Sequence, residues 1–167
     1  MLFVAMLTMG FDCINENALV SVNIPGLTGT YNINAGNNAN FNGAVAILAS
    51  DYLNLGFDNI NLNTTRIYDI RVSTIGSYSG NVNAQVLVNG TLLLSINNKP
   101  WSSFNTPQSL VTSTLLTRNG AGITTLISRI KSKQDITLST TGTVSPVPVP
   151  SGLQVKIEVL AQVDAEL

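Results

Sequence analysis

The sequence predicts an all-β protein, a jelly-roll-like antiparallel β-sandwich with about eight strands and at most one or two short helices. The clearest observation is residues 153–163, where apolar side chains occupy every second position and mostly polar side chains lie between them. A strand directs successive side chains to opposite faces, so this pattern gives one buried and one solvated face. Similar short runs recur along the chain between turn-forming residues, as is typical of a sandwich.

Length and composition fit one folded domain with a substantial core. The chain has 167 residues, of which 44% are hydrophobic and only 10% are charged, against about 25% charged residues in typical soluble domains. Asn, Ser, Thr and Gln take the place of charged residues. Such neutral groups cost less to desolvate than charges and are common on secreted and assembled surfaces. The codon usage of an AT-rich genome produces a similar composition, so this signal is not decisive alone.

Charge and metal-binding chemistry exclude several kinds of partner. The net charge of −1 does not favour nucleic acid or an acidic membrane surface. Arg129, Lys131 and Lys133 alternate along a predicted strand, and we interpret them as a solvated or edge-protecting face rather than an anion site. With one cysteine and no histidine, the chain has neither an internal disulfide nor the usual transition-metal ligands. We expect no cofactor.

Residues 1–13 form an apolar N-terminal segment ahead of a single β-sandwich domain at residues 14–167. The uncharged run at residues 1–9 is too short to span a membrane and lacks the basic region of a signal peptide. Three interpretations stay open: a clipped export signal, a buried strand of this domain, or an arm inserted into a neighbouring subunit. The last interpretation places a subunit interface at Leu2, Phe3, Val4, Ala5, Met6 and Leu7.

Several further strands follow from the same periodicity and from turn residues. Residues 43–49 are apolar throughout, as in a strand covered on both faces. Within residues 66–74, Tyr68, Ile70 and Val72 alternate and are expected to share the buried face. The remaining strands are predicted at residues 18–24, 31–33, 81–88, 91–96, 123–131 and 136–144.

Asn89-Gly90 is the strongest hairpin signal in the chain. A simple two-residue loop places the hydrophobic residues of the second strand opposite polar residues of the first. Shifting the register by one residue places Val86 opposite Leu94 and Ala84 opposite Ile96. We therefore predict a bulged or three-residue turn.

Two short helices and one stiff connector complete the prediction. Ser50-Asp51 provides a helix cap ahead of residues 52–56. Thr106-Pro107 resembles the start of a helix over residues 107–117, which Asn119-Gly120 would end. Residues 146–150 alternate proline and valine, and we expect an extended crossover between the two sheets.

The candidate binding residues are few. Asp51, Asp58, Asn59, Asn61 and Asn63 are a dense group of oxygen ligands, but their spacing does not match an EF-hand. We interpret the group as a connecting loop, with calcium as the alternative.

Trp101 is the only tryptophan. We interpret it as a plug at the end of the core, with contact to a ligand as the alternative.

These observations indicate a non-enzymatic protein. The absence of histidine excludes Ser-His-Asp and Cys-His catalysis, and no acid pair or phosphate loop is recognisable. The leading hypothesis is a structural subunit of an extracellular filament or surface coat that binds copies of itself, with residues 2–9 adding a strand to the neighbour's sheet. The alternatives are a virion protein of the capsid or spike, and a carbohydrate-binding or adhesin module that contacts glycan through Trp101, Tyr31 or Tyr78.

Overall fold

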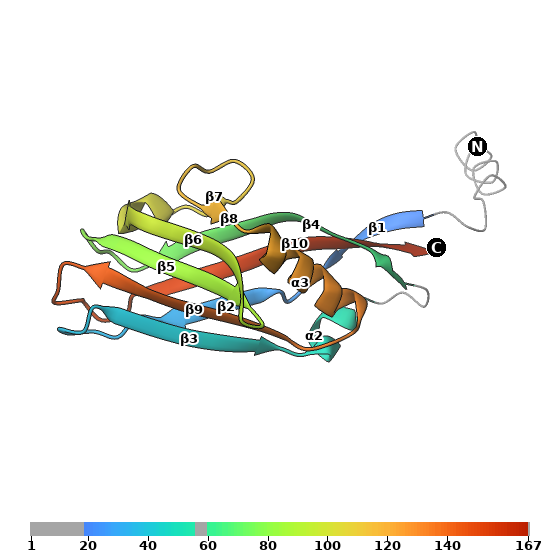
Figure 1. Cartoon of the computed structure of the whole chain (residues 1–167), viewed down its shortest axis with the longest axis horizontal. Coiled ribbons are helices and arrows are strands. Elements are labelled where there is room, and N and C mark those ends of the chain that lie inside the picture. Colours follow the sequence, from blue (N-terminus) through green and yellow to red (C-terminus); the bar gives the residue numbers. More distant parts are fainter. Residues whose placement is uncertain (1–18, 56–59, 167) are drawn as a thin grey trace, which may run out of the picture.

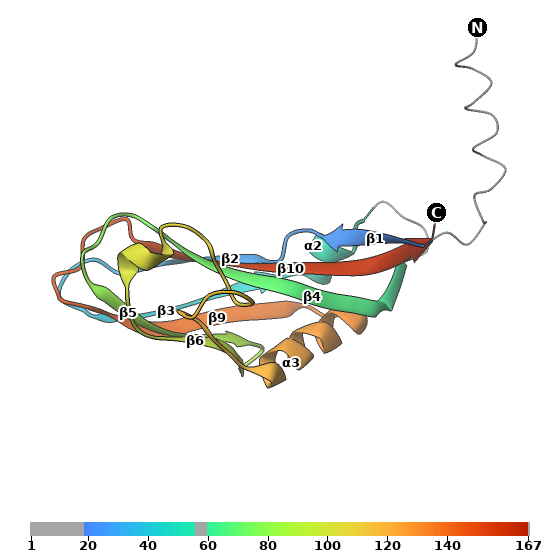
Figure 2. The same cartoon turned by 90° about the horizontal axis from the view of Figure 1, so that it is seen from above.

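The computed structural model describes residues 19–55 and 60–166, and these form an antiparallel β-sandwich of two five-stranded sheets. Figures 1 and 2 show the sheets as two layers, with helix α3 at one side. The predicted all-β sandwich is confirmed. The described residues contain ten strands rather than about eight, partly because two of the strands are only two residues long.

The first sheet is organised around β10 (Gln154–Glu166), which contains the strand predicted at residues 153–163. β10 pairs with β4 on one side and with β1 and β2, one after the other, on its other side. Val155, Ile157 and Val159 are all buried, so the predicted alternation is confirmed. The other strands of this sheet are β1 (Leu19–Ile24), β2 (Thr28–Asn32), β4 (Ile60–Ile75) and β7 (Gln108–Ser109).

The second sheet has the strand order β3-β9-β5-β6-β8. The chain changes sheet at most of its connections, which gives the sandwich its jelly-roll-like character. The proline-rich residues 146–150 connect the two sheets, as predicted, by joining β9 to β10. The strands of this sheet are β3 (Asn40–Ile47), β5 (Asn81–Val88), β6 (Thr91–Pro100), β8 (Thr117–Arg118) and β9 (Ile136–Ser145).

The β5–β6 hairpin contains the predicted bulge, although its turn has two residues. Val88 lies opposite Thr91 across Asn89-Gly90, and both turn residues have positive φ. The register then shifts so that Val86 faces Leu94, as predicted. The shift brings the hydrophobic side chains of the two strands opposite one another without lengthening the turn.

A second bulge changes which residues of β4 face the core. Leu160 lies opposite Asp69 while Ala161 lies opposite Ile67, so Tyr68 is an extra residue in β4. Tyr68 is exposed, whereas Ile70 and Val72 are buried. The prediction that these three side chains share one face is wrong for Tyr68, because a single inserted residue reverses the alternation.

The strand predicted at residues 123–131 is instead a helix, α3 (Gly120–Lys131). Asn119 begins this helix rather than ending the previous one, since its side chain accepts a hydrogen bond from the Ala121 amide. Gly122, Leu126 and Ile130 recur every four residues and form the buried stripe of α3.

The same correction applies to the basic residues. Arg129 and Lys131 occupy the last turn of α3 and Lys133 follows it, so they do not form the face of a strand. In that position their charges complement the negative end of the helix dipole.

The helix predicted over residues 107–117 is absent from this part of the described chain. Gln108 and Ser109 instead form β7 beside Arg71 and Val72, and the residues that follow are mainly turns. The helical residues nearby are the 3-10 turn η1 (Trp101–Phe104). Pairing with β4 therefore overrides the helix-start signal at Pro107.

β3 buries one face, so the prediction of a strand covered on both faces is wrong. Phe41 and Ile47 are buried, whereas Ala44 and Ala46 are exposed on the other side. Alanine is small and apolar but tolerates solvent, and the apolar run at residues 43–49 therefore overstated the burial of this strand.

Trp101 closes one end of the core, as its structural interpretation predicted. Its side chain is fully buried, its Nε1 donates to the Gly76 carbonyl at 2.9 Å, and its ring meets Tyr78 edge to face. The short helix α2 (Ala49–Leu53) lies slightly ahead of the predicted position, with Asp51 accepting a hydrogen bond from the Leu48 amide.

Tyr31 connects the two sheets from inside the core. It belongs to β2, and its hydroxyl donates to the Leu138 carbonyl of β9 at 2.9 Å. Gly29 and Gly43 provide the space for its ring, because a Cβ on either residue would lie within 3 Å of the Tyr31 side chain. Burial raises the pKa of the Tyr31 phenol above its ordinary value.

Candidate functional site

Charged side chains are distributed very unevenly over the two sheets. In the second sheet, strands β3, β5 and β9 contain no charged residue, and β6 and β8 contain one each, Lys99 and Arg118. By contrast, β4 and β10 of the first sheet carry Arg66, Asp69, Arg71, Lys156, Glu158, Asp164 and Glu166. Most of the charged residues in the strands therefore lie in the first sheet.

We call the outer surface of the second sheet the neutral face. Its side chains are amides, hydroxyls and small apolar groups, and strand register aligns them in rows, such as Asn42 opposite Thr141 and Thr141 opposite Gln85. Alternation with buried residues places all of them on the outer side of the sheet. The neutral face comprises Asn40, Asn42, Ala44, Ala46, Asn83, Gln85, Asn97, Ser139, Thr141 and Thr143.

The neutral face contains one shallow depression of about 220 Å³. Amide and hydroxyl groups in its lining can donate and accept hydrogen bonds, but none of them is a nucleophile with a neighbouring base. No charged or aromatic side chain contributes to the lining. The depression is lined by Asn83, Ala84, Gln85, Ile96, Asn97, Thr141, Gly142 and Thr143.

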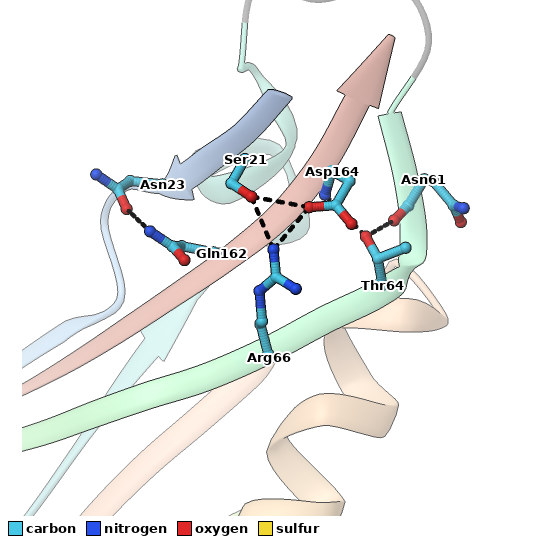
Figure 3. A network of polar contacts seen from close by, with 7 residues as sticks. All are labelled: Ser21, Asn23, Asn61, Thr64, Arg66, Gln162 and Asp164. Atoms are coloured by element: carbon cyan, nitrogen blue, oxygen red, sulfur yellow. Dashed lines mark hydrogen bonds and ion pairs between the residues drawn. The ribbon is translucent and has the colours of Figure 1, made fainter. Parts of the chain in front are cut away.

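The first sheet carries a polar network at the end where β1, β4 and β10 lie together (Figure 3). Arg66 Nη2 lies 2.8 Å from Asp164 Oδ1 and 2.7 Å from Ser21 Oγ, and Ser21 donates to the same carboxylate oxygen. Gln162 adds a hydrogen bond to Asn23 at 3.1 Å. The network joins three strands.

Thr64 satisfies the backbone where β4 departs from regular pairing. Its hydroxyl accepts from the Asp164 amide at 2.8 Å and donates to the Asn61 carbonyl at 2.7 Å (Figure 3). The register between β4 and β10 shifts at this point. The hydroxyl thus replaces a ladder bond that the irregularity removes.

Asp69 is a buried carboxylate, and its hydrogen bonds are satisfied. Its oxygens accept from Ser109 Oγ at 2.8 Å, from the Ile70 amide at 2.8 Å and from Arg71 Nε at 3.1 Å. The adjoining cavity is about 30 Å³, which suits a water molecule rather than a substrate. Asp69 therefore fixes β7 against the β4 bulge.

The predicted site residues do not come together in one place. Leu2, Phe3, Val4, Ala5, Met6 and Leu7 lie outside the described residues, as do Asp58 and Asn59 of the calcium alternative. Asp51 caps α2, while Asn61 and Asn63 belong to β4. No group of three potential metal-ligating residues of the His, Cys, Asp and Glu types occurs within residues 19–55 and 60–166.

The ligand-contact hypothesis for Trp101 required an exposed ring, and this ring is fully buried. Tyr31, a second proposed glycan contact, is buried as well. Sequence reasoning missed the neutral face, although a signal for it was present. Residues 40–47, 81–88 and 136–145 are strand segments without a charge, but only the sheet order shows that they are neighbours.

The fold places the protein in the β-sandwich class, and comparison with known proteins assigns it to no family within that class. The sequence matches no known family model, and no curated protein is significantly similar to it. Among the described residues, no helix is both long and apolar enough to cross a membrane.

Proposed function

We propose that this protein is a non-enzymatic structural subunit that binds copies of itself in an extracellular filament or surface coat. The observation that carries the proposal is the neutral face, together with the charge-free strands β3, β5 and β9 beneath it. Amide and hydroxyl groups cost less to remove from water than charges do, and they form new hydrogen bonds in a contact. Asp69 and Asp164 form hydrogen bonds and ion pairs with neighbouring residues of the protein, which supports a structural role for these charged residues as well.

Strand addition is the proposed means of association. Residues 2–9 of one subunit would extend a sheet of the next, with backbone hydrogen bonds providing affinity and alternate side chains providing specificity. Such a head-to-tail contact is heterologous, and it produces an open filament when the rotation between subunits does not close a ring. Residues 2–9 contain no charge and no proline, so nothing in their composition opposes strand pairing.

Sedimentation velocity of the full chain and of a chain lacking residues 2–9 tests this proposal. We expect concentration-dependent assembly of the full chain, its loss on deletion, and little change between low and high salt because the contact is uncharged. Assembly that is unchanged by deletion would remove the arm from the mechanism, and a monomeric full chain at all concentrations would contradict self-association. Recovery of the native protein from virus particles would assign the same subunit to a virion.

The depression on the neutral face supports glycan binding as a second candidate function. Its amide and hydroxyl lining suits sugar hydroxyls, although it lacks the aromatic ring on which sugars commonly stack. A glycan array probed with the protein and with a Gln85→Ala, Asn97→Ala double variant tests this candidate. Binding that the double variant loses would support it, whereas no binding by the unaltered protein would contradict it.

A further inference from the structure

We infer that the free edge of β3 is the acceptor for residues 2–9 of a neighbouring copy, an inference that rests on the proposed function. β3 is the end strand of the second sheet and, among the described elements, pairs only with β9. Its eight residues contain no lysine, proline or other residue that commonly protects a sheet edge. The pairing between β3 and β9 also runs without a register shift, so the edge is regular over its whole length.

The hydrogen-bond pattern identifies which backbone groups of β3 face outward. The Ala39 carbonyl accepts from the Val144 amide at 2.8 Å, which makes that opposed pair hydrogen-bonded. Because hydrogen-bonded and non-hydrogen-bonded pairs alternate in an antiparallel ladder, Phe41, Gly43, Val45 and Ile47 direct their backbone groups towards β9. The backbone groups that point away from β9, towards the position of an added strand, belong to Asn40, Asn42, Ala44 and Ala46, and of these the Asn40 amide already donates to Asn38 Oδ1 at 3.0 Å.

The other sheet edges are less suitable acceptors. β7, β8 and α3 lie along the β4 and β6 edges, and the amide of Leu110 already bonds to the Ile70 carbonyl. β4 is also interrupted by two register shifts against β10, which distort its edge. Opposite β4, the edge is divided between β1 and β2 with Pro25-Gly26 between them. β3 is therefore the longest regular edge in the described structure.

The arm and the edge match in length and chemistry. Residues 2–9 are an eight-residue uncharged segment, and β3 is an eight-residue uncharged strand. Val45 on β3 is only partly buried, so an added strand has an apolar side chain to cover. The nine residues at positions 10–18 can span about 30 Å when extended, which is enough to reach a neighbouring subunit.

Substitutions at Ala44 test the acceptor edge directly. Ala44→Pro removes an outward-facing amide without removing a bond to β9, and edge positions of this kind tolerate proline. Ala44→Lys adds a charge at the same position without altering the backbone, and it decides the test if the proline variant fails to fold. Val111→Lys is the control, since it places the same charge at an exposed position in the loop after β7, away from both β3 and the neutral face.

Sedimentation velocity should show self-association weakened at least tenfold by both Ala44 substitutions and little changed by Val111→Lys. A fluorescent peptide of residues 1–13 should bind the chain that lacks residues 2–9, and should not bind that chain when it also carries Ala44→Pro or Ala44→Lys. Full-length Ala44 variants that assemble as well as the control would overturn the β3 assignment while leaving the proposed function intact.

A third result would identify a different occupant. If the chain lacking residues 2–9 still assembles and the Ala44 substitutions abolish that assembly, the β3 edge pairs with a second β3 and the proposed arm is wrong. A monomeric full chain would instead contradict the proposed function itself.

Discussion

Replacing Gly122 with alanine should destabilise the protein, although the same change usually stabilises a helix. Gly122 lies in the first turns of α3, where alanine would ordinarily gain about 1 kcal/mol in helix propensity. A Cβ at this position would lie 2.3 Å from the Leu92 carbonyl oxygen and 2.5 Å from Leu93 Cα. The first distance is roughly 1 Å short of ordinary van der Waals contact. Both obstructing atoms are backbone, so no side-chain rotation relieves the clash.

Movement of α3 away from β6 would disturb further contacts. The Asn119 amide donates to the Leu93 carbonyl at 2.9 Å. Leu126 and Ile130 on the same helix have buried side chains, and they would also lose packing contacts. Overpacking of this kind costs about 1–3 kcal/mol, which exceeds the gain in propensity. We therefore expect a lower free energy of unfolding, by about 1–3 kcal/mol, and a melting temperature lower by about 2–4 °C for each kcal/mol.

Gly120→Ala is the matched control for this prediction. Gly120 begins the same helix, but a Cβ there would meet nothing within 4 Å. Its alanine variant should be unchanged or slightly more stable in urea and thermal denaturation. Equal stability of the Gly122→Ala and Gly120→Ala variants would refute the close packing of α3 on β6.

Two further predictions concern stability. Tyr31→Phe should lower the free energy of unfolding by about 0.5–1.5 kcal/mol through loss of the bond to Leu138, whereas Tyr68→Phe on the surface should have little effect. Burial raises the pKa of Tyr31 above its ordinary value of 10.0. Above pH 10 the unfolded chain therefore loses the phenolic proton while the folded chain keeps it, and the free energy of unfolding should fall as the pH rises further. That alkaline loss should be smaller in Tyr31→Phe; an identical pH profile would contradict the burial of this hydroxyl. Asp164→Asn should cost less than about 1 kcal/mol, because the Arg66 partner is half exposed, and high salt should reduce the difference; a larger, salt-independent loss in urea denaturation would contradict this view of the pair.

Period-two alternation predicted the strands well wherever burial followed it strictly. β10, the β5–β6 hairpin and the crossover at residues 146–150 could all be recognised from residue type and spacing. The predictions were wrong where the residue types of a segment are compatible with two different structures. Asn119 and Gly120 suit either end of a helix, and the β-branched residues between Ile123 and Ile130 favour strands, although their apolar spacing also fits a helix.

By itself, the sequence determined the fold class, the strands with one buried face, and the shortage of catalytic and metal-binding side chains. These properties follow from residue type and near-neighbour spacing, which the chain carries locally. Only the tertiary structure decided that α3 is a helix docked on β6, that Tyr31 lies inside the core, and that the charge-free strands form one face ending at the edge of β3. Each of these depends on which distant segments become neighbours, because close packing and strand pairing act between residues far apart in the sequence.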